Sequence, residues 1–243
     1  MDEPTHPDPV LARYLGAAYA RRNPSWDAED SSWKAGLVRD TLARAGLRPA
    51  SIADVGCGAG GVLAALRPFL PDARLCGFDV APAAARLWEA HAGRDIRFTL
   101  GDFLSTSERH DVVLLLDVIE HLANPFEFLA KVRPRGRHFV LHLPLDLSAL
   151  SVLRETPLLF VREKVGHLHY YTRSLALALL DECGYEVVDA RYTGAAFTAP
   201  QRSRASRLAG LVRRAAYALH HDFAVRLLGG ETVIVLATAG EGP

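Results

Sequence analysis

Carboxylates and glycines recur at the ends of short apolar runs, and together they could bind a polar, nucleotide-like ligand. The segment 56–61, which reads GCGAGG, follows an apolar run, and its missing side chains let the backbone approach a ligand near a helix N-terminus. Asp79, Asp102 and Asp117 close three further runs. An ionised carboxylate only accepts hydrogen bonds, so these side chains suit the hydroxyls and amines of a ligand.

Two classes of cofactor fit this pattern. Gly56, Gly58 and Gly61 satisfy the GxGxxG spacing of dinucleotide-binding proteins, and Asp79 lies near the offset of their ribose-binding acid. Asp54 before the first glycine and Asp102 at the end of the third predicted strand favour another cofactor, because a dinucleotide enzyme does not need them.

Two longer stretches resemble a known family. Residues 52–60, IADVGCGAG, resemble motif I of the class I S-adenosylmethionine-dependent methyltransferases. Residues 117–122, DVIEHL, are very similar to a motif of the ubiquinone-pathway and related small-molecule methyltransferases. The resemblance covers roughly 51–194 and is strongest up to Leu122. It implies S-adenosylmethionine as cofactor and S-adenosylhomocysteine as product.

The resemblance also implies roles for single residues. Asp54 and the glycine loop approach the methionine moiety, Asp79 takes the ribose hydroxyls, and Asp102 with Phe103 holds adenine. Asp117 and Val118 border the methyl-transfer channel. The full set of predicted cofactor contacts is Asp54, Gly56, Cys57, Gly58, Gly60, Asp79, Val80, Asp102, Phe103, Asp117 and Val118. On the preceding helix, beside Trp33, the Lys34 ammonium could reach the cofactor carboxylate or close a lid.

Histidines supply the candidate general bases, because histidine titrates near neutral pH. We favour His121 and His169 as catalytic residues, together with Tyr170. Residues 166–172, GHLHYYT, resemble a methyltransferase segment that lines the acceptor pocket; in the alternative interpretation, side chains such as His167 only hydrogen-bond the loop itself. His142 alternates with apolar neighbours on a predicted strand and is interpreted as a core histidine.

A metal site is an alternative at the end of the predicted strand 112–116. Asp117, Glu120 and His121 have the spacing to turn oxygen and imidazole ligands toward one cation, and similar residues bind a divalent metal in some relatives of the resembled family. Many relatives carry the motif without metal, and a full ligand set is not evident. We therefore expect no metal and interpret Glu120 as starting or capping a helix.

The elements that position these residues alternate between β-branched or aliphatic runs and helical patterns, which predicts a mostly parallel sheet. Predicted strands are 51–55, 74–79, 96–100, 112–116, 138–143, 186–192 and 233–237. Predicted helices are 10–21, 32–45, 61–69, 83–92, 124–132, 174–183 and 202–228. The fold prediction is an α/β, Rossmann-like doubly wound sheet of seven strands, mostly parallel with one reversed edge strand, and with helices on both faces.

The predicted organisation is an N-terminal helical lead-in or lid (1–50) before a methyltransferase core (51–243). Within the core, the loosely patterned loop 144–172 and a helical insert at 195–230 serve as a substrate cap. The insert is a basic amphipathic helix, which we interpret as a solvated cap. Alternatively, it contacts an anionic substrate or the surface of a membrane. Its arginines are Arg202, Arg204, Arg207, Arg213 and Arg214.

Bulk properties narrow the function classes. The 243 residues carry a net charge of +0, which counts against a dedicated nucleic-acid binder. The three cysteines form no CxxC pair, which suggests a reducing compartment. The acidic, proline-rich N-terminus does not resemble a secretory signal, and the apolar run 112–116 is too short to cross a bilayer. We expect a cytoplasmic protein that does not span a membrane, in an oligomeric state the sequence does not predict.

The predicted function is transfer of a methyl group from S-adenosylmethionine to an O or N atom of a small molecule, such as a secondary metabolite. Two alternatives remain open. An enzyme of the same fold could transfer or cyclise the aminocarboxypropyl group of the cofactor, or the chain could be a non-catalytic cofactor-binding partner protein.

Overall fold

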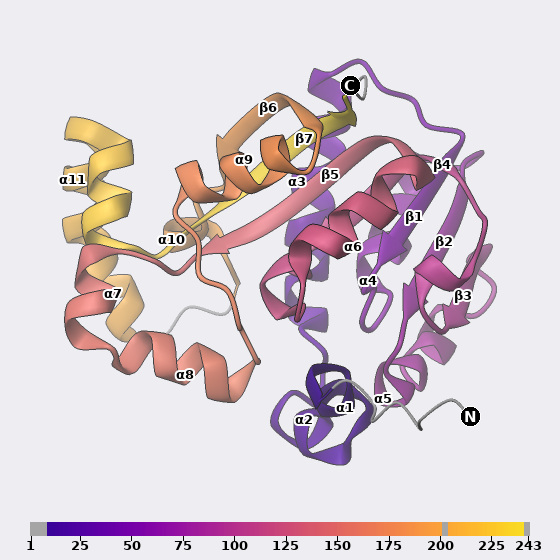
Figure 1. Cartoon of the computed structure of the whole chain (residues 1–243), viewed down its shortest axis with the longest axis horizontal. Helices are drawn as coiled ribbons and strands as arrows, with labels where there is room; N and C mark the ends of the chain where they lie inside the picture. The colour runs from indigo at the N-terminus through magenta and orange to yellow at the C-terminus, as the bar shows by residue number, and fades with distance from the viewer. Residues whose placement is uncertain (1–8, 201–203, 241–243) are drawn as a thin grey trace, which may run out of the picture.

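A seven-stranded sheet with helices on both faces forms the centre of the molecule in the computed structural model, which describes residues 9–200 and 204–240 (Figure 1). The strand order is β3-β2-β1-β4-β5-β7-β6. The strands are β1 (Ser51–Val55), β2 (Arg74–Asp79), β3 (Ile96–Leu100), β4 (His110–Leu116), β5 (Gly136–Leu145), β6 (Tyr185–Tyr192) and β7 (Glu231–Ala239). Every predicted strand is present.

The sheet is parallel from β3 to β5, and β7 runs antiparallel to both of its neighbours. The predicted fold is therefore confirmed, with the reversed strand β7 lying between β5 and the edge strand β6. The strand order reverses between β1 and β4, and open α/β sheets bind ligands outside the carboxyl ends of the strands at such a point.

Two helical layers explain why the central strands are almost wholly apolar, since both of their faces are buried. On one face, α3 (Ser31–Arg44) and α4 (Gly61–Leu66) pack on side chains such as Ile52 and Leu114. On the other, α6 (Pro125–Val132) and α9 (Arg173–Glu182) pack on side chains such as Val113 and Phe139. Figure 1 shows α6 on the side of the sheet opposite α3 and α4.

The turn after β1 requires glycine. Gly56 and Gly60 have φ values of +74° and +78°, a left-handed region that residues with side chains rarely adopt. A Cβ atom on Gly60 would lie 2.6 Å from the ring of Phe98. The sequence GCGAGG is thus needed to form the turn, whether or not a ligand is bound.

Two predicted helices are broken in the structure. The helix predicted over 10–21 divides at Gly16, which has extended φ and ψ values, into α1 (Pro9–Leu15) and α2 (Ala17–Arg22). The helix predicted over 83–92 is the single turn α5 (Pro82–Ala85) and a 3₁₀ turn, η3 (Trp88–His91). Other short 3₁₀ turns are η1 (Ala28–Asp30), η2 (Arg67–Phe69), η4 (Phe103–Ser105), η5 (Ile119–His121) and η6 (Arg133–Arg135).

The loosely patterned region 144–171 holds two helices, α7 (Ala149–Arg154) and α8 (Thr156–Lys164). Short helices give little periodicity, but Ser148 and Ser151 form a reciprocal cap that starts α7. With α11 (Arg204–Leu228), which is kinked at His220, they form a group at the left of Figure 1, away from β3. The single turn α10 (Ala195–Thr198) precedes α11.

The N-terminal helices are tied to this group. The Asn23 side chain donates a hydrogen bond to the Lys164 carbonyl oxygen at 3.0 Å, and the Arg22 guanidinium donates one to the Glu163 carbonyl oxygen at 3.0 Å. Both acceptors lie at the C-terminal end of α8. Across the described residues, no helix is long and apolar enough to span a membrane.

Candidate functional site

A cavity of about 360 Å³ lies at the carboxyl ends of β1, β2 and β4, where the strand order reverses. Every predicted cofactor contact except Gly60 lines it. Gly60 lies beside the ring of Phe98, so its contribution is the shape of the turn. Residues from the N-terminal helices close the opposite wall: Val10, Leu11, Tyr14, Tyr19, Trp26, Asp27, Ser31 and Lys34.

Asp79 fixes the glycine loop. One carboxylate oxygen accepts the Gly58 N–H at 2.9 Å, and the other accepts the Ala81 N–H at 2.8 Å. Burial raises the pKa of Asp79, and these two N–H groups oppose the shift. Each oxygen has two lone pairs, so the carboxylate can still accept from ligand hydroxyls while it holds the loop.

Asp54 is a buried carboxylate whose partner is absent. The residue is 2% exposed and lines the cavity, and its carboxylate makes no hydrogen bond with any other described residue. Burial raises the pKa of Asp54 to about 7, against a smaller opposing effect of Lys34. Because Asp54 lines the cavity and an ionised carboxylate only accepts hydrogen bonds, a ligand that brings a donor would complement it there.

Lys34, Asp117 and His142 form a partly buried chain of polar contacts beside Asp54. The Lys34 Nζ lies 2.6 Å from one oxygen of Asp117, and the His142 Nδ1 lies 2.6 Å from the other. Although burial alone would raise it, His142 and Lys34 hold the pKa of Asp117 well below its usual range. The backbone of Asp117 has a φ of +56°, a strained value for a non-glycine residue.

Lys34 is also the only lysine or arginine among the described residues that line the cavity. Trp33 is not among these lining residues; its ring packs edge-on against His142, with centroids 5.6 Å apart. His142 therefore has a polar task as well as a buried position, because its other nitrogen lies 2.8 Å from the Thr232 hydroxyl.

Asp102 and Phe103 lie at the end of β3. One oxygen of Asp102 accepts the Leu104 N–H at 2.8 Å and caps η4, while the residue remains exposed and lines the cavity. Phe103 is 1% exposed and packs on Phe78, with ring centroids 5.0 Å apart. Capping and ligand binding are therefore compatible at Asp102.

Of the three predicted catalytic residues, only His121 lines the cavity. Its Nδ1 lies 2.9 Å from the Tyr14 hydroxyl, and burial together with His167 lowers the pKa of His121 to about 3. The His169 Nε2 donates a hydrogen bond to the Leu122 carbonyl oxygen at 2.9 Å. The Tyr170 hydroxyl donates one to the Leu158 carbonyl oxygen at 3.2 Å. Both hold the backbone of neighbouring segments.

Glu120 is fully buried behind His121. The Nε2 atoms of His121 and His167 each lie 4.0 Å from one of its oxygens, and no described side chain donates a hydrogen bond to the carboxylate. Burial and the nearby Asp117 raise the pKa of Glu120. Donor atoms of Glu120, His121 and His167 all lie within 4.8 Å of one another, close enough for one cation.

Sequence reasoning missed the aromatic wall of the cavity. Tyr19 packs between Tyr14 and Trp26, with ring centroids 4.8 Å and 5.0 Å apart. The aromatic residues of the lead-in were the available signal, but their position above the glycine loop depends on the break at Gly16. No described residue of 144–172 or 195–230 lines this cavity.

The arginine-rich insert is described in part. Arg202 and the side chains of Arg204 and Arg207 lie outside the described residues. Arg213 donates to the Leu228 carbonyl oxygen at 3.5 Å, and the Arg214 guanidinium lies over the ring of Phe197 at 5.2 Å. These two arginines contact their own cap.

Solved structures share this architecture over nearly the whole chain. Magnesium protoporphyrin IX methyltransferase from Synechocystis PCC 6803, with bound SAH, has a TM-score of 0.61 and 16% identity and covers 95% of this chain and 98% of its own. A plantazolicin methyltransferase in complex with a substrate analogue and SAH also has a TM-score of 0.61 and 16% identity, over 96% of both chains. At such identities the likeness shows the fold, the Rossmann-like α/β fold of the class I methyltransferases.

Sequence relatives match about half of the chain. A ubiquinone biosynthesis O-methyltransferase of Methylobacterium sp. is 36% identical over 111 residues, covering 42% of this chain and 44% of its own. Another, from Cereibacter sphaeroides, is 34% identical over 138 residues, covering 53% and 51%. The chain thus spans about half the length of the curated relatives it matches.

A family model described as a methyltransferase domain matches residues 31–190, which include α3, the glycine loop and the DVIEHL stretch. The chain belongs to this methyltransferase family.

Proposed function

We propose that the protein binds S-adenosylmethionine in this cavity and transfers its methyl group to an O or N atom of a small-molecule acceptor. The observation that carries the proposal is Asp54, a buried carboxylate that faces the cavity without a partner. A ligand with an ammonium group would satisfy it, and the cofactor has one on its methionine moiety.

The other cavity groups complement the rest of the cofactor. Lys34 supplies the cation that a methionine carboxylate requires. Asp79 offers acceptors to the two ribose hydroxyls, and the free oxygen of Asp102 offers one to the adenine amine. These four side chains follow the order of the cofactor's own groups, from Asp54 and Lys34 at the methionine end, through Asp79, to Asp102 at the adenine end.

When bound, S-adenosylmethionine supplies a methyl group already activated by its sulfonium. The chain therefore mainly has to position an acceptor, since holding two reactants in line supplies much of the rate. Asp117 and Val118 border the place where the acceptor would lie, and His121 faces the same space. Its lowered pKa makes His121 a weak base, so we assign it a hydrogen bond from an acceptor hydroxyl rather than removal of the proton.

Small-molecule acceptors are favoured by the nature of the cavity and by the relatives. The walls beyond the carboxylates are apolar and aromatic, which is typical of sites for small organic ligands. The relatives named above are ubiquinone biosynthesis O-methyltransferases. We also propose a domain organisation. Residues 1–50 act as a lid over the cofactor, and two cap segments, 144–172 and 195–230, approach the acceptor from outside the cavity. The proposed reaction requires no metal at Glu120.

The test is a calorimetric titration of the full chain with S-adenosylmethionine, S-adenosylhomocysteine and NAD(P)H in parallel, repeated with Asp54→Asn. We expect the sulfonium compound and its product to bind and the nicotinamide to fail. Asp54→Asn keeps the shape and removes the charge, so it should weaken binding by about tenfold to a hundredfold, as expected for a charged hydrogen bond. Preference for NAD(P)H would overturn the proposal.

Product analysis then tests the reaction. Incubation with candidate acceptors should release S-adenosylhomocysteine; methylthioadenosine would instead identify aminocarboxypropyl transfer. Tight cofactor binding without turnover across a broad acceptor panel would favour a non-catalytic partner protein.

A further inference from the structure

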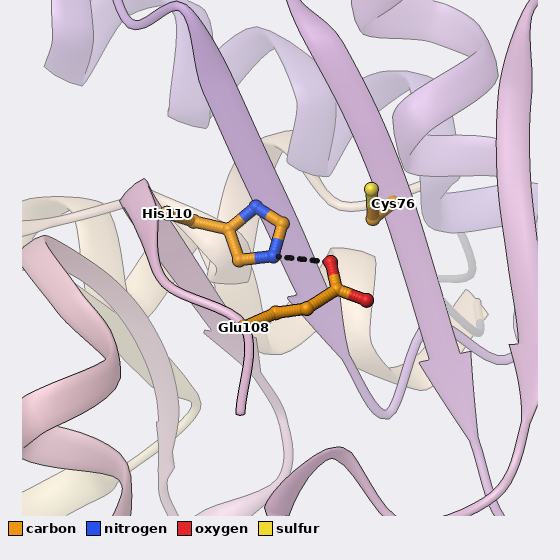
Figure 2. A group of neighbouring side chains, drawn as sticks. All are labelled: Cys76, Glu108 and His110. Carbon is orange, nitrogen blue, oxygen red and sulfur yellow. Dashed lines mark ion pairs between the residues drawn. The ribbon is translucent and has the colours of Figure 1, made fainter. Parts of the chain in front are cut away.

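A second group of ligand-type side chains lies away from the cofactor cavity, on strands β2 and β4 and the loop before β4. Cys76, Glu108 and His110 place one donor atom each within 4.8 Å of one another. Figure 2 shows the Glu108 carboxylate turned toward the His110 ring, with Cys76 on β2, which β1 separates from β4. None of the three lines the cofactor cavity, so the proposed methyl transfer does not explain them.

His110 is the unusual member of the group. Its side chain is fully buried, and neither ring nitrogen has a hydrogen-bond partner among the described residues. The Nε2 atom lies 3.4 Å from an oxygen of Glu108. Burying an imidazole without a hydrogen bond is costly, and a bound ligand at His110 would offset that cost.

Cys76 and Glu108 complete a donor set of mixed character. Cys76 is 0% exposed, and the Glu108 side chain, 27% exposed, leaves a path from solvent. Thiolate, imidazole and carboxylate oxygen are the ligands of zinc sites, whereas magnesium and calcium sites use oxygen alone. Three protein ligands plus one water would complete a tetrahedral shell.

We propose that Cys76, Glu108 and His110 bind a thiophilic divalent cation, with Zn²⁺ as the chemical type. On binding, the Cys76 thiol gives its proton to solvent and its sulfur bonds to the metal, while His110 binds through a neutral nitrogen and Glu108 through an ionised oxygen. No oxidation or reduction is involved.

A guanidinium now occupies part of the site. Arg97 donates to the Cys76 sulfur at 3.4 Å and forms a close ion pair with Glu108, and Arg74 lies 3.4 Å from the same carboxylate. Both arginine side chains are about half exposed, so each can turn into solvent when a metal enters. Arg97 is therefore a competitor, and its removal should strengthen metal binding.

The site would fasten β2, β4 and the loop between β3 and β4 to one another. This loop begins with Asp102 and Phe103, and the Phe103 ring lies 6.1 Å from that of His110. A metal bound only by the folded chain raises the stability of that chain. Binding would therefore stabilise the side of the core next to Phe103.

The experiment is a Co²⁺ titration of the reduced, metal-free full chain, because thiolate-bound cobalt has a charge-transfer absorption that carboxylate and imidazole sites lack. We expect a band that saturates at one equivalent and disappears on adding Zn²⁺. It should be lost in Cys76→Ser and kept in the matched variant Cys183→Ser, whose cysteine lies elsewhere in the fold. Zn²⁺ should raise the Tm of the natural chain and leave that of Cys76→Ser unchanged.

Arg97→Met is the second, independent variant, and it changes a half-exposed side chain that folding tolerates. Removing this competing charge should tighten cobalt binding by roughly tenfold. Absence of the band in both the natural chain and Arg97→Met would overturn the proposal, as would a band that survives Cys76→Ser. Cobalt binding without the charge-transfer band would place the metal at Glu120, His121 and His167 and would also overturn it.

Discussion

Single carboxylates decide which ligand this cavity can accept. Asp79 is already satisfied by two backbone N–H groups and adds ligand contacts to them. Asp54 has no such partner, and Asp117 shares its charge with Lys34 and His142. The three acids therefore differ in what they can accept: Asp54 has no bonded partner and suits a cation, Asp79 can add uncharged donors to its two N–H groups, and Asp117 is already paired.

Asp54 makes cofactor affinity depend on pH. The free protein holds Asp54 with a pKa of about 7, and an ammonium ligand binds only its ionised form. Below this pKa the carboxyl group must lose its proton before the ligand binds. The Kd should therefore rise by about tenfold for each unit by which the pH is lowered. Calorimetry between about pH 5.5 and 7.5 measures the slope. Asp54→Asn should flatten it; an equal slope in both proteins would assign the proton to another group.

Replacing Lys34 should weaken binding of the cofactor product but not binding of adenosine. Lys34→Met keeps the length of the side chain and removes the cation that we assign to the methionine carboxylate. Binding of S-adenosylhomocysteine should weaken by about tenfold to a hundredfold, the range for a charged hydrogen bond. Adenosine lacks the carboxylate and serves as the matched ligand, whose affinity should stay unchanged. If both ligands weaken alike, Lys34 supports the fold of the cavity through Asp117.

At the scale of the elements, the glycine turn is held from both sides. Asp79 binds the Gly58 N–H from the end of β2, and the Trp88 indole of η3 donates to the Gly58 carbonyl oxygen at 2.8 Å. His91 lies 3.0 Å from the Ala59 carbonyl oxygen. The helix predicted over 83–92 is interrupted there, and its short turns place the two side chains under the loop.

Gly60→Ala should destabilise the fold through two separable effects. Gly60 has a φ of +78°, and a Cβ atom there would meet the Phe98 ring at 2.6 Å. Gly93 has the same φ with nothing within 4 Å, so Gly93→Ala measures the backbone cost alone. We expect about 1 kcal/mol for Gly93→Ala and about 2–4 kcal/mol for Gly60→Ala in urea unfolding. Equal losses would show that Phe98 moves aside at no cost.

Across the whole molecule, hydrogen bonds connect the N-terminal segment α1–α3, our proposed lid, to α8, part of our proposed cap. The segment α1–α3 contributes residues to the wall of the cavity, whereas α7 and α8 contribute none. Asn23 joins the two through its bond to Lys164 and is itself buried, at 7% exposure. A change in α8 can therefore reach the cofactor without touching it.

Asn23→Ala should open the lid. Loss of a buried hydrogen bond of about 1 kcal/mol would raise the cofactor off-rate by roughly fivefold. Arg22→Ala removes the neighbouring, exposed bond to Glu163 and serves as the control, with a change below about twofold. Stopped-flow displacement of S-adenosylhomocysteine measures both rates. Unchanged release in Asn23→Ala would mean that the lid is held by its aromatic contacts instead.

The sequence by itself determined the sheet and the acids that lie at the ends of its strands. Every strand was predicted from the sequence pattern. The central strands are buried on both faces, so they are apolar runs that can be recognised without knowing which strands pair. The acids at the strand ends were equally visible, since the carboxyl ends of parallel strands converge on one edge of the sheet.

Only the tertiary structure decided which other residues meet. Local pattern did not separate His121, which lines the cavity, from His169 and Tyr170, which brace the backbone, because all three belong to loops or short turns. His142 looked like a core residue until Asp117 and Thr232 were found on either side of it. Cys76, Glu108 and His110 carry no motif, because they come together only when β2 and β4 lie on the two sides of β1.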